Sequence, residues 1–310
     1  MKDGYPLVSI TVLTYNSSSY LEETLNSIKE QTYQKIELII SDDCSTDDTL
    51  KICEEWTERN KLRFVDVRVL KVDVNTGVAA NGNRARKNCR GEWIKGIAGD
   101  DKLLPNCIED NLQYVKDNPQ AEVLFSKMVF FGTREALSNY PITINYGPFF
   151  ISEKYFYKRL LRRNFIPAPS LFIKRQIYVK YGYYDESIPL MEDWPFWMKL
   201  AYNGVRFAFM DKDTVMYRVH QSLSVSPKSS AKFLESQAKA RRLSEKYAKE
   251  VSLPFYIYIK TLNISKNSII VKLLKQFLLM INPYFYFFVV KMQREKSFNE
   301  RIHISKEIIN

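Results

Sequence analysis

The chain has 310 residues, 45% of them hydrophobic, which is enough to bury one large domain with an appendage. Its net charge of +11 is uneven: residues 1–225 hold 30 Lys and Arg against 29 Asp and Glu, and residues 226–310 hold 16 against 6. The near-neutral body argues against a nucleic-acid-binding core. The basic tail points to an anionic surface, with a membrane as the first candidate.

The first residues run directly into a strand-like segment, without an apolar signal sequence. The four cysteines have neither metal-site nor disulfide spacing. We therefore expect a cytoplasmic protein whose cysteines are reduced thiols.

Strand-like and helix-like segments alternate through the first hundred residues. The predicted strands lie at 7–13, 36–40, 65–69 and 92–98. Ser19 with Glu22 fits a capping box at the start of the first intervening helix. This order, with short connections, predicts an α/β fold with a mostly parallel sheet and helices on both faces.

Each predicted strand is followed by polar residues. They are Thr14-Tyr15-Asn16, Asp42-Asp43, Asn75 and Asp100-Asp101. Ligands of such sheets bind beyond the carboxyl ends of the strands, so these residues predict one shared site. Paired carboxylates suit Mg²⁺ or Mn²⁺ holding a substrate phosphate, although an Asp-rich turn that caps a helix is the structural alternative. No dinucleotide fingerprint or P-loop is present, so a nucleotide sugar fits better.

The second half is less regular. Residues 123–131 and 170–173 read as strands, whereas 132–168 lack clear periodicity. Glu192-Asp193 opens a predicted helix, and a strand-like segment at 214–219 precedes His220. Residues 231–250 read as a charged amphipathic helix.

Taken together, the motifs resemble glycosyltransferase family 2, with the GT-A fold, from about Val8 to about Ser226. The resemblance rests on the order of Thr14-Tyr15-Asn16, Leu25–Thr32, Ile40–Asp47, Asn75-Thr76-Gly77, Asn83, Gly91–Ile94, Gly99-Asp100-Asp101, Glu192-Asp193 and Tyr217–His220. It implies an enzyme that transfers a sugar from a nucleoside diphosphate donor, usually with inversion.

The resemblance also implies roles for the strand-end residues. Thr14 and Tyr15 would line the base pocket, with Asn16 and Asn75 at the same nucleotide-sugar site. Asp43 would accept a hydrogen bond from uracil. Asp100 would face the ribose or the metal shell, and Asp101 would bind the divalent metal directly. Many family members carry a further Asp where this chain has Ala98, so the ligand role rests more heavily on Asp101.

By the same resemblance, Asp193 would be the general base that deprotonates the acceptor. The alternative for an acidic pair at a helix start is a favourable interaction with the helix dipole. Trp194 would stack on the acceptor sugar or belong to the core. His220 would be a third metal ligand, a contact to the diphosphate or an ordinary loop histidine, and Arg218 would neutralise phosphate or pair with a surface carboxylate.

The tail contains a run of 15 residues without charge, 276–290, which is shorter than the roughly 20 that span a bilayer. Its aromatic cluster and the lysines around it predict an interfacial segment. Packing on the catalytic domain and a homodimer contact are the alternatives.

We therefore expect a GT-A catalytic domain over residues 1–225, followed by a basic helical region over 226–310. Within the domain, residues 1–105 would bind the donor and 106–225 the acceptor. The predicted reaction is metal-dependent, inverting transfer from a UDP-sugar to a saccharide or lipid-linked acceptor at the inner face of the membrane. A sugar-nucleotide nucleotidyltransferase and a non-catalytic GT-A scaffold are the rival predictions.

Overall fold

The computed structural model describes residues 6–133, 137, 152–219, 231–263, 273 and 277. The chain forms two compact units, Met1–Leu243 and Ser244–Asn310. Their boundary lies inside a helix, whereas the boundary predicted near residue 225 lies outside the described residues.

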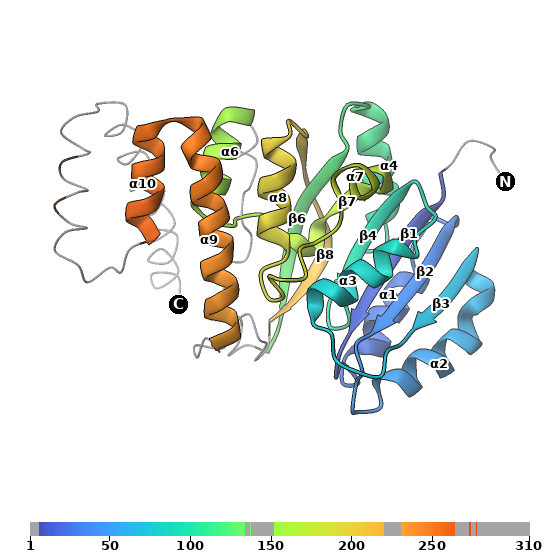
Figure 1. The fold of residues 1–310 in the computed structure, drawn as a ribbon. Helices are drawn as coiled ribbons and strands as arrows, with labels where there is room; N and C mark the ends of the chain where they lie inside the picture. Colours follow the sequence, from blue (N-terminus) through green and yellow to red (C-terminus); the bar gives the residue numbers. More distant parts are fainter. Residues whose placement is uncertain are drawn as a thin grey trace, which may run out of the picture. The chain divides into compact units, whose positions relative to one another are not determined.

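The first unit is built on a mixed sheet, which has eight strands in the described part of the chain. They are β1 (Val8–Thr14), β2 (Ile36–Asp42), β3 (Asp66–Leu70), β4 (Trp93–Ala98), β5 (Lys102–Leu103), β6 (Val123–Gly132), β7 (Phe172–Lys174) and β8 (Phe207–Val219), in the order β3-β2-β1-β4-β7-β6-β8-β5. Strands β1 to β4 pair in parallel. Because β7 is antiparallel to β4 and β6, and β8 is parallel to β6, strands β6 and β8 point the same way as β1. Six carboxyl ends therefore meet at one edge of the sheet (Figure 1).

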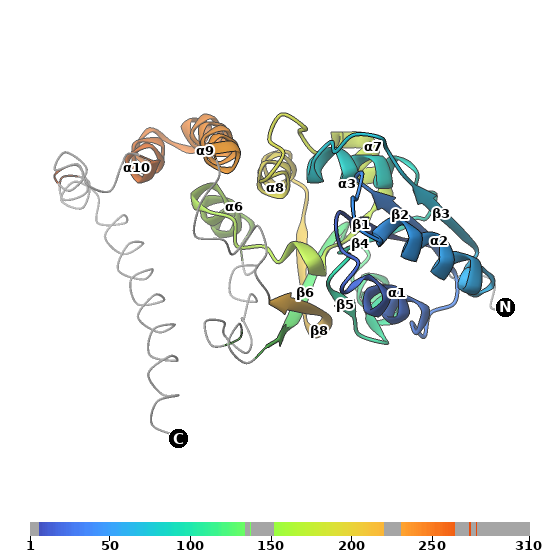
Figure 2. The same ribbon diagram turned by 90° about the horizontal axis from the view of Figure 1, so that it is seen from below.

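Helices cover both faces of this sheet (Figure 2). On one face, α1 (Leu21–Lys29), α2 (Thr49–Asn60) and α4 (Cys107–Asp117) bury apolar residues against β1, β2 and β4. The other face carries α3 (Val78–Lys87), α7 (Arg175–Tyr181) and α8 (Asp193–Tyr202), and α6 (Glu153–Arg162) packs on α8. Two short 3₁₀ turns, η1 (Lys61–Arg63) and η3 (Ala168–Ser170), complete the unit.

The predicted strands at 7–13, 36–40, 65–69 and 92–98 are confirmed as β1 to β4, as is their parallel order. The predicted capping box is wrong, because α1 begins at Leu21 and no side chain caps it. Instead, the Ser17 carbonyl accepts the backbone N–H groups of Tyr20 and Leu21 in a turn. Residues 132–168 are not wholly irregular, since they include α6, which buries Phe156 and Leu160 on one side.

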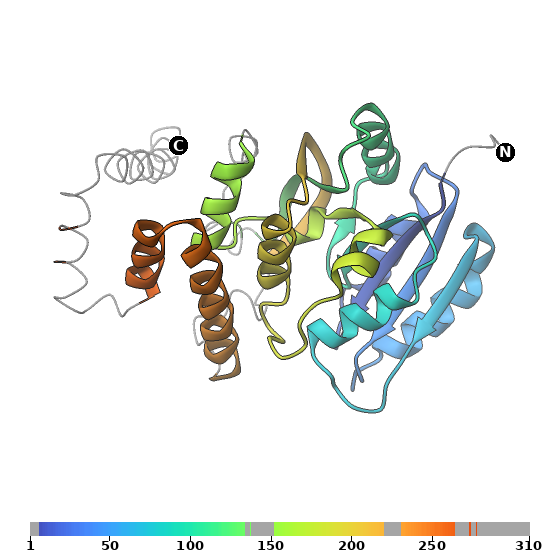
Figure 3. The ribbon, with the colours of Figure 1, turned by 45° about the horizontal axis from the view of Figure 1, so that its top comes forward.

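The second unit consists, in its described part, of the end of α9 (Ala231–Val251) and of α10 (Leu253–Asn263), joined by a short turn (Figure 3). Tyr258 and Ile259 are buried, and Asn263 donates a side-chain hydrogen bond to Glu245 at 2.7 Å. The predicted helix at 231–250 is confirmed as α9. Among the described helices none has the length and apolarity needed to cross a membrane. The run 276–290 lies outside the described residues, apart from Phe277.

Candidate active site

The connections after β1 and β2 are held together by their own side chains. Asn16, with a φ of 50°, accepts the Thr46 N–H at 2.8 Å through its side-chain oxygen, and its own N–H donates to the Ser45 hydroxyl at 2.9 Å. Cys44 also has a positive φ, 65°. Left-handed backbone in two non-glycine residues is costly, so these contacts fix an unusual loop geometry at the carboxyl edge. Tyr15 stays 47% exposed beside it.

Thr14 joins two strands through its side chain. It is buried, and its hydroxyl donates to Asp42 Oδ1 at 2.8 Å across the β1–β2 pair. The sequence did not show that this hydroxyl joins two strands, and the expectation that Thr14 lines the base pocket stays a prediction. Tyr15 remains the open aromatic side chain of that segment.

Asp43, at the end of β2, organises the turn before α3. Its carboxylate accepts hydrogen bonds from the Thr76 hydroxyl and N–H, from the Gly77 N–H at 2.7 Å and from Arg84 at 3.1 Å. Burial acts to raise the pKa of Asp43, but these hydrogen bonds outweigh it and the pKa is lowered. Asp43 is thus ionised, and it anchors the turn before α3 through hydrogen bonds, a role the sequence did not predict.

Arg84 was also missed. Besides Asp43, its guanidinium donates to the Ser41 hydroxyl and to the Asn81 side chain, so one side chain joins β2 to α3. The helical spacing of Asn81 and Arg84 after Gly77 was the available signal.

Replacing Asp43 by Ala should cost the folded state about 3 kcal/mol, because it leaves Arg84 and two backbone N–H groups without their buried acceptor. Urea unfolding followed by circular dichroism measures this. Asp211→Ala, at an exposed carboxylate on β8, is the matched control and should change stability by less than about 0.5 kcal/mol. Equal stabilities of the two variants would contradict the anchoring role.

The Asp100-Asp101 pair follows β4, as predicted, and the short β5 follows it. Asp101 is buried, and its Oδ1 accepts the Arg218 N–H at 2.8 Å, while the Asp100 carbonyl accepts from the Arg218 guanidinium. Burial, together with the charge of Asp100, raises the pKa of Asp101 to about 8. An ionised Asp101 therefore needs a positive charge nearby.

Arg218 takes the second of its two predicted roles, because it forms an ion pair with the half-exposed Glu23 at 2.9 Å. It also packs between the rings of Tyr20 and Phe131. The side chain is thereby held at the edge of the sheet next to the acidic pair.

The fit of a divalent metal at this site can be tested on the residues themselves. No group of three or more His, Cys, Asp or Glu able to hold a metal ion occurs in the part of the chain that the structure describes. His220 lies outside that part. Mg²⁺ is commonly held by one or two carboxylates together with substrate phosphates, and the buried Asp101 meets that requirement.

The second acidic pair lies at the start of α8. This helix leads through a short connection into the amino end of β8, so its first turn lies at the carboxyl edge of the sheet (Figure 1). Asp193 accepts hydrogen bonds from the Asn164 side chain and from the Trp194 N–H, both at 2.7 Å. Asn164 was missed because nothing in its local sequence marks it.

Both carboxyl groups of this pair are easier to protonate than usual. Burial raises the pKa of Asp193, and the hydrogen bonds from Asn164 and Trp194 oppose the shift only in part. Burial and the charge of Asp193 raise the pKa of Glu192 to about 8. A carboxyl group with a pKa raised towards neutrality is suited to general base catalysis.

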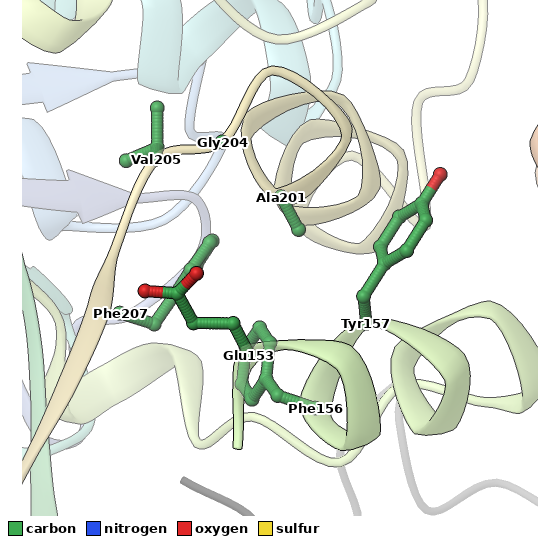
Figure 4. Close-up of a pocket in the computed structure, with 7 residues that line it drawn as sticks. All are labelled: Glu153, Phe156, Tyr157, Ala201, Gly204, Val205 and Phe207. Atoms are coloured by element: carbon green, nitrogen blue, oxygen red, sulfur yellow. The ribbon is translucent and has the colours of Figure 1, made fainter.

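Trp194 belongs to the core. It is 4% exposed, and its indole N–H donates to the Leu160 carbonyl at 2.7 Å. The structure thus favours the core alternative for Trp194, because the inward side of α8 packs against α6, and stacking on an acceptor sugar stays a prediction. A small pocket lined by Glu153, Tyr157 and Phe207 lies at the other end of these helices (Figure 4). Since Phe207 begins β8, the pocket is at the amino edge of the sheet, away from both acidic pairs.

The mixed sheet with acidic residues at its carboxyl edge is that of a GT-A glycosyltransferase. The chain belongs to glycosyltransferase family 2, because the model of that family, described as "Glycosyl transferase family 2", matches residues 9–179. The family and the GT-A fold predicted from the sequence are thereby confirmed.

Individual relatives agree with this assignment. An uncharacterized glycosyltransferase of Methanocaldococcus jannaschii is 29% identical over 220 residues, which are 69% of this chain and 71% of the relative. The Escherichia coli UDP-Glc:alpha-D-GlcNAc-diphosphoundecaprenol beta-1,3-glucosyltransferase WfaP is 27% identical, with 69% and 78% covered. A crystal structure of Staphylococcus aureus TarS in complex with UDP superposes with a TM-score of 0.59 at 25% identity, covering 82% of this chain and 69% of that one.

Proposed function

We propose that the protein transfers a sugar from a UDP-sugar to a hydroxyl group of a saccharide acceptor, with inversion and with the help of a divalent metal. The observation that carries the proposal is the presence of two separate acidic groups at one edge of the sheet. Asp101 is held by the Arg218 N–H at the end of β4, and Asp193 is held by Asn164 at the start of α8. A single-displacement transfer needs both a site for the departing diphosphate and a base for the acceptor.

In this mechanism Asp101 and Asp193 have separate roles. Asp101 would hold the metal, which when bound offsets the negative charge that develops on the departing nucleotide. Asp193 takes the proton of the acceptor hydroxyl as its oxygen bonds to the anomeric carbon, and the bond from that carbon to the diphosphate breaks. Attack opposite the departing UDP turns an α-linked donor into a β-linked product. Tyr15, Asn16, Asp43, Asn75 and Asp100 surround the donor at the strand ends.

The names of relatives support a UDP donor and a polysaccharide or lipid-linked acceptor. WfaP is named for transfer from UDP-Glc to a diphosphoundecaprenol-linked sugar, and TarS was crystallised with UDP. We infer that this chain works on the same kind of acceptor in cell-surface polysaccharide synthesis.

A donor screen tests the proposal. Purified protein with Mn²⁺ is given a panel of UDP- and GDP-sugars with short saccharide acceptors, and nucleotide release is followed. We expect release with a UDP-sugar and a β linkage by NMR. An α-linked product would overturn inversion. Absence of any release across donors and acceptors would favour the non-catalytic scaffold.

We also propose attachment of the basic C-terminal region to an anionic membrane surface. Each Lys or Arg near such a surface contributes about 1 kcal/mol, and salt weakens the attraction. Full-length protein should therefore sediment with anionic liposomes at low salt and less so at high salt. Replacing Lys272, Lys275 and Lys291 by Gln should weaken sedimentation.

The matched control replaces Lys35, Lys51 and Lys116 of the near-neutral body by Gln and should sediment like the original protein. If the original protein stays in the supernatant at low salt, membrane attachment is wrong. Equal sedimentation with neutral liposomes would leave an aromatic anchor and remove the electrostatic part.

A further inference from the structure

Arg86 is a buried charge that contacts no carboxylate in the part of the chain that the structure describes. Its side chain comes from α3 and is buried on the face of the sheet below β1 and β4. The Nε donates to the Tyr178 hydroxyl at 3.0 Å and Nη2 to the Tyr184 hydroxyl at 3.1 Å. Among the described residues, no salt bridge includes Arg86 and its Nη1 has no hydrogen-bond partner. Two neutral phenols cannot offset the charge of a guanidinium, which stays protonated in proteins.

Gly82 makes room for this guanidinium. A Cβ added at Gly82 would come within 2.4 Å of Arg86 Nη1, and one added at Gly96 would lie 3.6 Å from Nη2. Side chains on a helix lean towards its amino end, so Arg86 reaches from the last turn of α3 towards the carboxyl edge of the sheet. The charge is therefore directed at the end of the sheet where the acidic residues lie.

The rings around Arg86 pack directly on the first turn of α8. Tyr178 stacks on Phe196 with centroids 5.2 Å apart, and Tyr184 meets the same ring edge-on at 5.2 Å. Asn83, three residues before Arg86 on α3, exchanges two hydrogen bonds with the backbone of Tyr184, both at 3.0 Å. One helix thus holds both the buried cation and the segment that leads into Glu192 and Asp193.

We propose that Arg86 is the buried counter-charge that keeps one carboxyl group of the Glu192–Asp193 pair ionised and so available as a base. The inference rests on the proposed role of Asp193. The charge of Arg86 stabilises the ionised form of Glu192, opposing burial and the charge of Asp193. Two adjacent carboxyl groups titrate together, so a single negative charge is a property of the pair and not of either residue alone. With the Arg86 cation buried nearby, the favoured state has one proton on the pair. Arg86 is then a positioning residue and touches no substrate.

Other polar and charged groups lie on the elements packed around the pair, and among them α6, which packs on α8, contributes Arg162 and Arg159, whose guanidinium lies over the Phe165 ring. Asn164 and the Trp194 N–H contact Asp193 but are neutral, and so are Tyr178 on α7 and Tyr184 before α8. Lys199 on α8 donates to the Tyr183 carbonyl, and its charge acts on Asp185. Lys87 of α3 lies over the Tyr183 ring.

Two variants separate charge from packing. Arg86→Gln removes the charge and keeps hydrogen-bond donors, whereas Arg86→Lys keeps the charge. A cation near a carboxyl group usually changes its pKa by about one to three units. In Arg86→Gln the acid limb of the kcat/KM profile should move up by about one pH unit or more. Activity near neutral pH should fall about tenfold and recover at high pH, while UDP affinity stays the same.

Arg86→Lys should keep the acid limb close to that of the original protein. A loss in Arg86→Gln that is equal at every pH, or a Lys variant that behaves like the Gln variant, would overturn the counter-charge role. If Arg86→Gln does not fold, Arg86→Met gives the same comparison in an apolar form that fills the space.

A readout independent of turnover keeps this inference separate from the function of Asp193. Trp194 lies beside the pair, so its fluorescence should titrate with it, and the midpoint should rise in Arg86→Gln. If the Asp193→Asn variant stays active, and the fluorescence midpoint still rises in Arg86→Gln, then Asp193 is not the base but Arg86 is still the counter-charge. If the midpoint does not move, the counter-charge is wrong whatever the base.

Discussion

Asp193→Asn should lower transfer by about 10²–10⁴-fold while leaving UDP affinity unchanged. The amide has nearly the shape of the carboxylate, and its one oxygen can still accept the Trp194 N–H, whereas the hydrogen bond that Asn164 donates to the second carboxylate oxygen is lost. It cannot take a proton from a sugar hydroxyl at neutral pH. The expected loss therefore appears in kcat, measured by nucleotide release at saturating donor, and not in calorimetric titration with UDP.

The control is Asp211→Asn, which changes an exposed carboxylate on β8 that pairs with Lys127. It should turn over at the rate of the original protein. The original protein should also lose activity as pH falls through the raised pKa of Asp193, because protonation removes the base. If a folded Asp193→Asn variant has near-normal turnover, Asp193 is not the base and only stabilises the start of α8.

The first hundred residues were predictable because their signals are local. Strands β1 to β4 alternate with helices, and each strand ends in a polar cluster, so position in the sequence translated directly into position at the edge of the sheet. The Asp100-Asp101 pair was located for the same reason. The burial of Thr14 was not, because its hydroxyl bond to Asp42 joins residues 28 positions apart.

The second half depends on contacts between distant segments. Asn164 meets Asp193 across 29 residues, and Arg86 meets Tyr184 across 98 residues. Periodicity in one segment carries no information about such pairs. Trp194 shows the same limit. In the sequence, a tryptophan at a helix start is equally consistent with stacking on a sugar and with burial in the core, and only its hydrogen bond to the Leu160 carbonyl favours the core.

Asp101→Asn should weaken Mn²⁺-dependent UDP binding by at least about tenfold, the lower end of what even an outer-shell change costs a metal site. The residue is buried, and the described residues offer no group of three or more His, Cys, Asp or Glu able to hold a metal ion. The fold should survive, because the amide oxygen can still accept the Arg218 N–H and the neutral amide suits the buried position, where burial already raises the pKa of the carboxyl.

Calorimetry with UDP in Mn²⁺ and in EDTA separates the metal from the rest of the site. In EDTA the variant and the original protein should bind UDP equally, since Tyr15 and the strand-end loops are unchanged. In Mn²⁺ the original protein should gain affinity and the variant should gain little. If both gain equally, the metal is held without Asp101. If neither gains, the site binds the diphosphate without a metal, and Arg218, already fixed beside the Asp100 carbonyl, becomes the cation to test next.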